Sequence, residues 1–420
     1  MSDWDISAYQ DIVDTMQARR QDLLAEAERL VAHLPLKYLR QQAQFTTPAS
    51  NYDMLLKAVE GGQKATPKIL DKFGISIREL ADTIEVPESV IEETLAAPDP
   101  RAPFVMVDGE DAQALRDDVV ARGRLNAVKI FREANWAHTL RFYRPSGLSL
   151  DYCIEDLVIV LTQAAKDKDP ADFPIDGIVW PKVEHPEQIR MVSDLLGELE
   201  HRLGLPENRI KMEFLVESGW AASQLPLIVR EVMPRIAGII WGIADYSADI
   251  NLPHIINDHP VCDWVRMVII NMAGALGVPA IDNMTVNYPV ADKSLDEKAN
   301  HDHILARLKE VYDDAAHGQA LGMGGKWVGH PAQLFMVRLA YRVALPENEI
   351  AQEVSKIEAY VKAVEAEQGA TIIDGVMSDR ATDRHARNKL RTAIAIGHLD
   401  ANKGIELGLI TKDEAAELGL

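Results

Sequence analysis

Apolar residues in this chain gather in short runs separated by longer segments with helical periodicity. Eight of the runs have the composition of β-strands, and they lie at residues 43–48, 103–108, 138–145, 175–182, 210–218, 236–245, 279–288 and 320–329. Strands that alternate with helices predict an α/β fold with a parallel sheet. Eight such units predict a closed (β/α)8 TIM barrel, which we place at residues 41–345.

Helical patterns also flank and interrupt the predicted barrel. Residues 1–40 set Ile12, Met16 and Leu23 among charged positions, which predicts a helical N-terminal extension. Residues 61–100 form a helical insertion between the first two strands. The insertion faintly resembles a DNA-binding helix-turn-helix, but its faces are acidic, whereas a recognition helix needs basic residues. We therefore expect it to pack on the barrel or on a neighbouring subunit.

The end of the chain, residues 346–420, returns to helix and predicts a C-terminal helical lid. Gly369 and Gly397 follow periodic segments and are predicted helix stops. The segment LPENE that joins these helices to the barrel is a plausible hinge.

Composition narrows the classes of partner. The formal net charge of −21 disfavours binding to nucleic acids or anionic membranes, because both repel an acidic surface. Cys153 and Cys262 form no motif, so we interpret them as buried thiols in a reducing compartment. The first residues lack the pattern of a signal peptide, and no apolar run reaches about 20 residues. We expect a cytoplasmic protein.

Two acidic residues stand at the ends of consecutive apolar runs. Glu217 follows KMEFLV and Asp245 follows IAGIIWGIA, one strand–helix–strand step later. In a parallel barrel, such strand ends meet at the same C-terminal mouth. Two carboxylates there suit a hard divalent cation such as Mg²⁺. The alternative is two solvated carboxylates at the starts of loops.

Other charged residues follow the neighbouring strands. Asp108, Glu110 and Asp111 cluster after the second strand. Arg144 ends the third strand, where it could grip a carboxylate at two points or neutralise a developing enolate. We prefer it to Arg141, whose side chain points to the opposite face of the strand.

Lys182 ends the fourth strand in GIVWPK. A lysine at a barrel mouth could form a Schiff base, but this requires a depressed pKa in a dry pocket. Beside several carboxylates it is better interpreted as an ion-pair partner that organises the floor of the site.

Several segments together resemble one family, the citrate lyase β-subunit and malyl-CoA lyase group of the aldolase and malate synthase superfamily. The segments that carry the resemblance, in chain order, are AQFTTPASNYDMLLKAVEGG, VDGEDA, FYRPSG, VESGWA, GIADYSAD, VPAIDNMTVNY and GMGGKWVGHPAQL. They cover roughly residues 40–60 and 100–385. Ala49 and Asn283 replace glycines of the family pattern.

The resemblance implies a site. It assigns Glu217 and Asp245 as ligands of Mg²⁺ or Mn²⁺, and it assigns Arg144 as the group that stabilises the enolate of an acyl-CoA. It implies that a C-terminal aspartate, here Asp379 in GVMSD, reaches a neighbouring subunit's site as an acid or base. The alternative for Asp379 is an N-cap of the following helix. His330, after the last strand, is a weaker candidate for proton transfer.

The substrate-binding residues expected from this reading are Glu110, Asp111, Lys182 and Ala244. The implied reaction cleaves or forms a carbon–carbon bond between a CoA thioester and a 2-oxoacid such as glyoxylate or pyruvate. A malate synthase, a malyl-CoA thioesterase and a CoA-independent 2-oxoacid aldolase remain alternatives, as does a degenerate barrel that acts as a binding subunit. We expect a homo-oligomer, a trimer or hexamer, with shared active sites.

Overall fold

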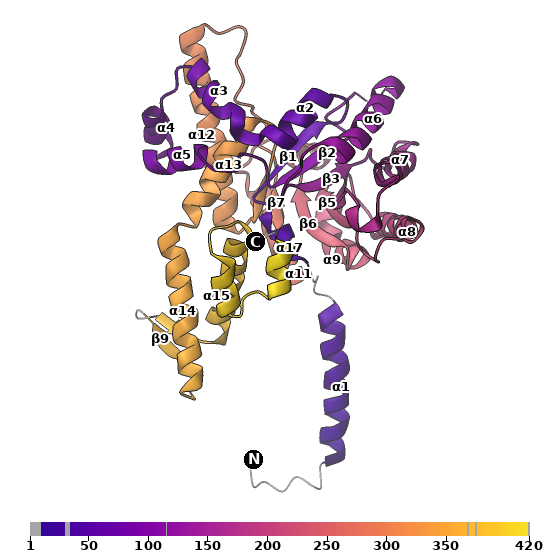
Figure 1. Cartoon of the computed structure of the whole chain (residues 1–420), viewed down its shortest axis with the longest axis vertical. Coiled ribbons are helices and arrows are strands. Elements are labelled where there is room, and N and C mark those ends of the chain that lie inside the picture. The colour runs from indigo at the N-terminus through magenta and orange to yellow at the C-terminus, as the bar shows by residue number, and fades with distance from the viewer. Residues whose placement is uncertain (1–9, 30–33, 115, 368, 374–375, 419–420) are drawn as a thin grey trace.

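Eight parallel strands close into a barrel in the computed structural model, which describes residues 10–29, 34–114, 116–367, 369–373 and 376–418 (Figure 1). Each strand pairs with the next along the chain, and β1 closes the barrel by pairing with both β2 and β8. The strands are β1 Ala43–Pro48, β2 Phe104–Asp108, β3 Leu140–Arg144, β4 Gly177–Trp180, β5 Lys211–Val216, β6 Ile236–Trp241, β7 Ala280–Asp282 and β8 Gly325–Val328. The predicted (β/α)8 barrel is thus confirmed, and each predicted run contains one strand.

Helices surround the barrel between successive strands (Figure 1). Those that follow the strands are α2 Tyr52–Leu56, α6 Asp117–Glu133, α7 Cys153–Ala165, α8 Pro186–Leu203, α9 Gly219–Val232, α10 Ile243–Asp249, α11 Pro260–Leu276, α12 Glu297–Leu321 and α13 Pro331–Ala344. Short helical turns connect other segments, namely η2 Leu36–Arg40, η3 Lys57–Gly61, η4 Gly62–Ala65 and η5 Pro170–Asp172.

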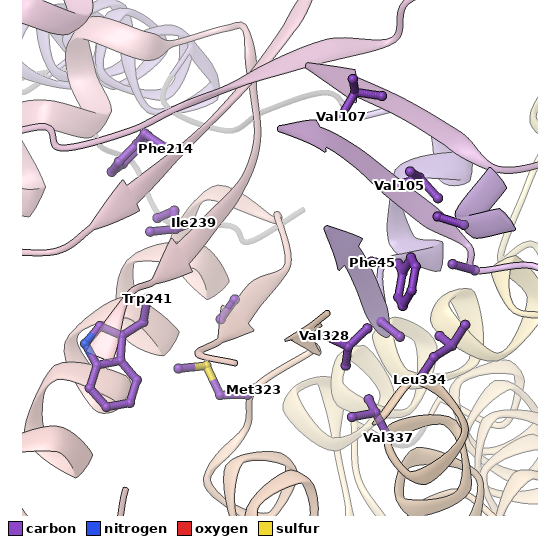
Figure 2. Packing of buried hydrophobic residues seen from close by; sticks show 14 of the residues in the cluster. Phe45, Val105, Val107, Phe214, Ile239, Trp241, Met323, Val328, Leu334 and Val337 are labelled. Carbon is purple, nitrogen blue, oxygen red and sulfur yellow. The ribbon is translucent and has the colours of Figure 1, made fainter. Parts of the chain in front are cut away.

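The pleat of the strands divides their side chains between two layers. One set fills the inside of the barrel, where it forms a separate cluster with Phe104, Phe142, Leu215 and Trp327 among its members. The other set points outward to the helices: Figure 2 shows Phe45 and Val328 close to Leu334 and Val337 of α13. Burial of each such side chain contributes on the order of 1.5–3 kcal/mol to stability.

A carboxylate shares the barrel interior with these apolar residues. Glu213 of β5 is fully buried, and its Oε2 accepts a hydrogen bond from Gln44 Nε2 at 2.7 Å. Its other oxygen has no hydrogen-bond partner among the described residues. Burial raises the pKa of Glu213 to about 8, so the residue is mainly protonated at neutral pH.

The insertion forms α3 Thr66–Lys72, α4 Ile77–Ile84 and α5 Glu88–Leu95. In Figure 1 these helices flank α12 and α13, and contacts of α4 with α12 and of α5 with α13 fix them there. The side chain of Ser76 caps α4 by accepting a hydrogen bond from the N–H of Glu79. His301 of α12 ties the insertion down through Glu79 and the carbonyl of Phe73, both at 2.8 Å.

The C-terminal helices lie at the end of the barrel opposite to its mouth. They comprise α14 Glu347–Glu365, α15 Arg380–Ala395, α16 Ala401–Glu406 and α17 Lys412–Glu417, with a hairpin of β9 Thr371–Ile373 and β10 Val376–Ser378. Their apolar core includes Leu36 of η2, just before β1. Contacts of η2 with α15 and α17 hold them at the amino ends of the strands, so they do not cover the mouth of their own barrel.

One of the two predicted helix stops is confirmed. α15 ends at Ala395, and Gly397 follows it with φ +80°. The stop predicted at Gly369 is wrong, because α14 already ends at Glu365 and Glu367 adopts the left-handed backbone.

The N-terminal extension contains α1 Gln10–Arg29, a helix that projects away from the barrel (Figure 1). The remaining parts of the predicted extension at residues 1–9 and 30–33 lie outside the described residues. Within the described ranges, none of the helices combines the length and the apolarity needed to cross a membrane. Both cysteines are buried free thiols.

Candidate active site

A cavity of about 460 Å³ opens at the carboxyl ends of the barrel strands. Three charged side chains in its lining come from strand ends: Asp108 ends β2, Arg144 ends β3 and Glu217 directly follows β5. Each continues the alternation of inward-facing residues on its strand. The pleat that fills the barrel with apolar residues therefore presents charged groups at its mouth.

Arg144 is held at two points by Asp108. Its Nε donates to Asp108 Oδ1 at 2.7 Å and its Nη2 to Oδ2 at 2.5 Å. Asp108 also accepts the backbone N–H groups of Glu110 at 2.9 Å and Ala112 at 3.2 Å. Both ion-pair partners are buried, so Asp108 fixes the orientation of the guanidinium. Of the two roles predicted for Arg144, this geometry disfavours the two-point grip, because a carboxylate of the chain already occupies the fork.

The third nitrogen of Arg144, Nη1, is buried and lacks a hydrogen-bond partner within the described part of the chain. Glu110 Oε2 lies 3.3 Å away without hydrogen-bond geometry, and it too is unpaired. The guanidinium stands 5.1 Å from the centre of the Trp327 ring. Leaving a buried hydrogen-bond donor unpaired destabilises the folded protein by about 1–3 kcal/mol. Nη1 is therefore positioned to donate a hydrogen bond to an oxygen of a ligand.

Lys182 connects two parts of the mouth. Its Nζ lies 2.9 Å from Glu110 Oε1 and 3.0 Å from Asp111 Oδ1, and its backbone N–H donates to Glu217 Oε2 at 3.0 Å. Burial opposes the charged amine, but the ion pairs with Glu110 and Asp111 outweigh it and raise the pKa of Lys182. A charged amine cannot start a Schiff base, so the geometry favours the ion-pair role. Burial raises the pKa of Glu110 to about 7.

Glu217 fits against Gly242. A Cβ on Gly242 would lie 2.6 Å from Glu217 Cγ and 2.7 Å from Oε1, so only glycine leaves room for this carboxylate. Burial raises the pKa of Glu217 to about 8, and the nearby charges of Asp245 and Glu110 add to the effect while Arg144 opposes it. The carboxylate is thus buried among like charges.

Asp245 lines the same cavity but does not end a strand. β6 ends at Trp241, and Asp245 lies in the first turn of α10, which starts at Ile243. The prediction that the strand continues to residue 245 is wrong, because Gly242 interrupts it and a new helix begins. Ala244, in the same turn, also lines the cavity.

The arrangement can be tested for its fit to a divalent cation. No group of three or more His, Cys, Asp or Glu side chains forms a metal site among the described residues. Mg²⁺, however, is commonly held by one or two carboxylates, with water and substrate completing its shell. Glu217 and Asp245 line the cavity together, and the charge of Asp245 raises the pKa of the buried Glu217, so the two carboxyl groups lie close enough to share an ion. The donor set fits the ion.

The two candidates for proton transfer lie in different surroundings. Asp379 is the N-cap of α15 and accepts the N–H groups of Ala381 at 2.9 Å and Thr382 at 3.1 Å. These bonds lower its pKa. It lines a concavity formed by the C-terminal helices, away from its own barrel's mouth. His330 caps α13, and burial lowers its pKa to about 4.

Arg141 lies outside the barrel. Its Nε donates to Asp176 Oδ2 at 3.0 Å, and Asp176 also pairs with Lys37. The structure therefore separates the two arginines of the third strand, with Arg144 inside the cavity and Arg141 behind the sheet.

The segment GMGGKWVGHPAQL mostly serves the scaffold. Lys326 is buried, and its Nζ lies 2.7 Å from the carbonyl of Asn283 and 2.8 Å from Asp314 Oδ2. Gln333 Nε2 donates to the carbonyl of Thr285 at 2.9 Å. These contacts join β8 to β7 and α12, and they leave Trp327 as the member of the segment that lines the cavity.

The residues from Leu140 to Leu418 match the model of a family described as a domain of unknown function, DUF6986. The chain belongs to this family. An L-malyl-CoA/β-methylmalyl-CoA lyase of Haloarcula marismortui is 28% identical over 225 residues, 53% of this chain and 62% of that protein. The match thus spans less than two thirds of that relative.

A lyase of the same name from Cereibacter sphaeroides is 26% identical, covering 70% of this chain and 87% of its own. These relatives show that the DUF6986 chain is similar to malyl-CoA lyases, in agreement with the resemblance that its sequence motifs carry. The fold is shared with the protein CitE of Mycobacterium tuberculosis, solved with magnesium, acetoacetate and coenzyme A. The TM-score is 0.50 at 18% identity, over 84% of this chain and 98% of CitE.

Sequence reasoning missed three contributors to this site. The pairing of Asp108 with Arg144 joins two strands, so no local motif reveals it. Gly242 lies inside an apolar run, and nothing in the sequence around it indicates that a carboxylate packs against it. Trp327 could have been found, because alternation along GKWV places it on the inner face of β8.

Proposed function

We propose that this chain is a Mg²⁺- or Mn²⁺-dependent CoA-ester lyase that cleaves or forms the bond between an acyl-CoA enolate and a 2-oxoacid such as glyoxylate or pyruvate. The observation that carries the proposal is the meeting of Glu217, Asp245 and the unpaired nitrogen of Arg144 in one cavity. The lyase names of the relatives support it, as do the magnesium and coenzyme A bound to CitE.

Glu217 and Asp245 would hold the cation. Its chemistry, when bound, is to polarise the carbonyl of the 2-oxoacid and fix its carboxylate. Glu217 must be ionised to bind the cation. The backbone N–H of Lys182 donates a hydrogen bond to its Oε2 and so keeps the buried carboxylate pointing into the cavity.

In the cleavage direction, the ionised carboxylate of Asp379 from a neighbouring subunit would take the proton of the 3-hydroxyl group, and the bond between the second and third carbons breaks. The electron pair passes to the thioester as an enolate while the hydroxyl carbon becomes the carbonyl of the oxoacid. Arg144 Nη1 donates to the enolate oxygen. It needs no reorientation, because Asp108 already holds the other two nitrogens.

The enolate carbon then takes up the proton that was removed from the hydroxyl group. We assign this transfer to Asp379 of a neighbouring subunit, because each chain's own Asp379 lies with the C-terminal helices beyond the opposite end of the barrel. The ion pairs of Lys182 with Glu110 and Asp111 would close the rim beside the bound ester.

The test is incubation of the purified protein with Mg²⁺ and a panel of 3-hydroxyacyl-CoA esters. A lyase releases an oxoacid without free thiol, whereas a thioesterase releases free thiol without oxoacid, so measuring both separates the two. Glu217→Gln should abolish turnover, and Glu184→Gln, an exposed glutamate after β4, should retain it. Absence of oxoacid from every ester, with the protein folded and Mg²⁺ present, would overturn the proposal.

A further inference from the structure

A second cavity lies at the other end of the barrel, where the amino ends of β2 and β3 meet the C-terminal helices. Its volume is about 220 Å³. Arginines from three separate segments line it: Arg40 of η2, Arg101 before β2 and Arg338 of α13. In a chain with a formal net charge of −21, three arginines around so small a space are unusual.

Arg101 stands on a turn that is braced from two sides. The carbonyl of Pro100 accepts the N–H of Gln63 at 2.9 Å, and the carbonyl of Ala102 accepts the hydroxyl of Thr139 at 2.8 Å. Gly62 packs so closely on this turn that a Cβ would lie 2.7 Å from Arg101 Cα. The turn therefore presents Arg101 in a fixed position, and Arg101 Nε is buried without a hydrogen-bond partner in the described structure.

Arg338 holds the same turn from α13. Its Nη1 lies 3.3 Å from the carbonyl of Asp99 and 3.5 Å from that of Arg101. These two bonds use one nitrogen, and no further bond of this guanidinium occurs among the described residues. Arg338 is thereby tied to the backbone of the turn that carries Arg101, and both arginines line the same cavity.

Arg40 closes the cavity from the C-terminal side. Its Nε donates to the carbonyl of Ala395 at 2.9 Å and its Nη2 to that of Leu418 at 2.9 Å. These bonds satisfy carbonyl groups at the carboxyl ends of α15 and α17, which would otherwise repel an anion.

Positive charge exceeds negative charge in this cavity. Asp99 is the one acidic residue among its described lining residues; it is half-exposed and contacts Arg101 at 3.3 Å. Burial lowers the pKa values of Arg40 and Arg338, as expected for cations that lack a full counter-charge. Planar guanidinium groups match the oxygens of phosphate at two points.

We propose that this cavity binds a phosphate group, free or carried by a nucleotide, through Arg101 and Arg338, with Arg40 closing the site. A bound phosphate would join the turn before β2, α13 and the C-terminal helices. The site is independent of the proposed lyase reaction, because it lies at the opposite end of the barrel.

The experiment is titration of the full chain with inorganic phosphate and, separately, with ADP, by calorimetry and by the shift in melting temperature, against chloride at equal ionic strength. We expect one bound phosphate per chain and a rise in melting temperature with concentration. If inorganic phosphate binds and ADP does not, the ligand of this site is the free ion. If ADP binds more tightly than inorganic phosphate, the ligand is a nucleotide.

Arg101→Gln and Arg338→Gln should each weaken binding at least about 10-fold. The matched control is Arg342→Gln, one turn further along α13, where the arginine pairs with Glu93 outside the cavity. It should bind as wild type does, which separates specific binding from the general stabilisation that phosphate gives proteins. If Arg101→Gln folds poorly, Arg101→Lys replaces it in the test, because lysine keeps the positive charge but lacks the planar guanidinium that contacts phosphate at two points. Absence of binding to wild type, or equal affinities in all variants, would overturn the proposal.

Discussion

Glu213, in the interior of the barrel, should make stability depend on pH. Burial raises its pKa from the ordinary value of 4.5 to about 8 in the folded protein. Below the pKa of the unfolded state, Glu213 is protonated in both the folded and the unfolded protein, so its titration does not change the free energy of unfolding. As pH rises, the unfolded state releases its proton first, so stability is lost progressively until the folded pKa is passed.

The size of the effect follows from the shift. Each pH unit between the two pKa values costs about 1.4 kcal/mol, so the loss from about pH 5 to about pH 8 is on the order of 4 kcal/mol. Glu213→Gln removes this titration. Its amide oxygen can accept the bond from Gln44, and its amide nitrogen takes the position of an oxygen that has no partner.

The assay is urea unfolding of the wild type and of Glu213→Gln at several pH values between about pH 5 and about pH 8. The free energy of unfolding of the variant minus that of wild type should grow steadily with pH, since all other titrating groups cancel in the difference. Glu198→Gln, a surface glutamate of α8, is the control, and its difference from wild type should stay constant. A difference for Glu213→Gln that is flat with pH would refute the reasoning.

Four further predictions concern the candidate site. Glu217→Gln should lose Mg²⁺ binding in calorimetry together with Mg²⁺-dependent turnover; binding at wild-type affinity would show that Glu217 is no ligand. Gly242→Ala should move the Glu217 carboxylate, because its Cβ would lie 2.6 Å from Glu217 Cγ, and so weaken Mg²⁺ at least about 10-fold while circular dichroism stays unchanged. Arg144→Lys should fold but lose about 10²-fold or more in kcat, since lysine lacks the planar fork, whereas Arg141→Lys should stay active; the reverse result would exchange the two roles. Mixing Asp379→Asn with Arg144→Ala subunits should restore part of the activity if sites are shared, and no recovery after proven subunit exchange would mean that each chain completes its own site.

The length and spacing of the apolar runs were sufficient to predict the barrel, because its strands are apolar on both faces and end at turn residues. They predicted less well where a helix starts directly after a strand. The apolar run IAGIIWGIA predicts a strand that ends at Asp245, and only the fold shows that α10 begins at Ile243. The β9–β10 hairpin was missed, because three-residue strands are too short to show alternation.

The candidate site was predictable as a set of strand ends but not as a set of contacts. Glu217 and Arg144 could be named because charged residues that end apolar strands must face the mouth. That Asp108 occupies two nitrogens of Arg144 depends on register between neighbouring strands, and sequence spacing does not supply it. The same holds for Asp379, whose place depends on how the C-terminal helices pack.

The closed ring of strands sets a lower limit on what can fold alone. The family match starts at Leu140, the first residue of β3, so it leaves out β1 and β2. A fragment trimmed to that match would expose β3 and β8 as two unpaired edges, which are templates for aggregation. The fragment would also lack Asp108, so the Arg144 guanidinium would lose the carboxylate that it pairs with. The smallest piece worth expressing therefore begins before Ala43, well upstream of the matched region.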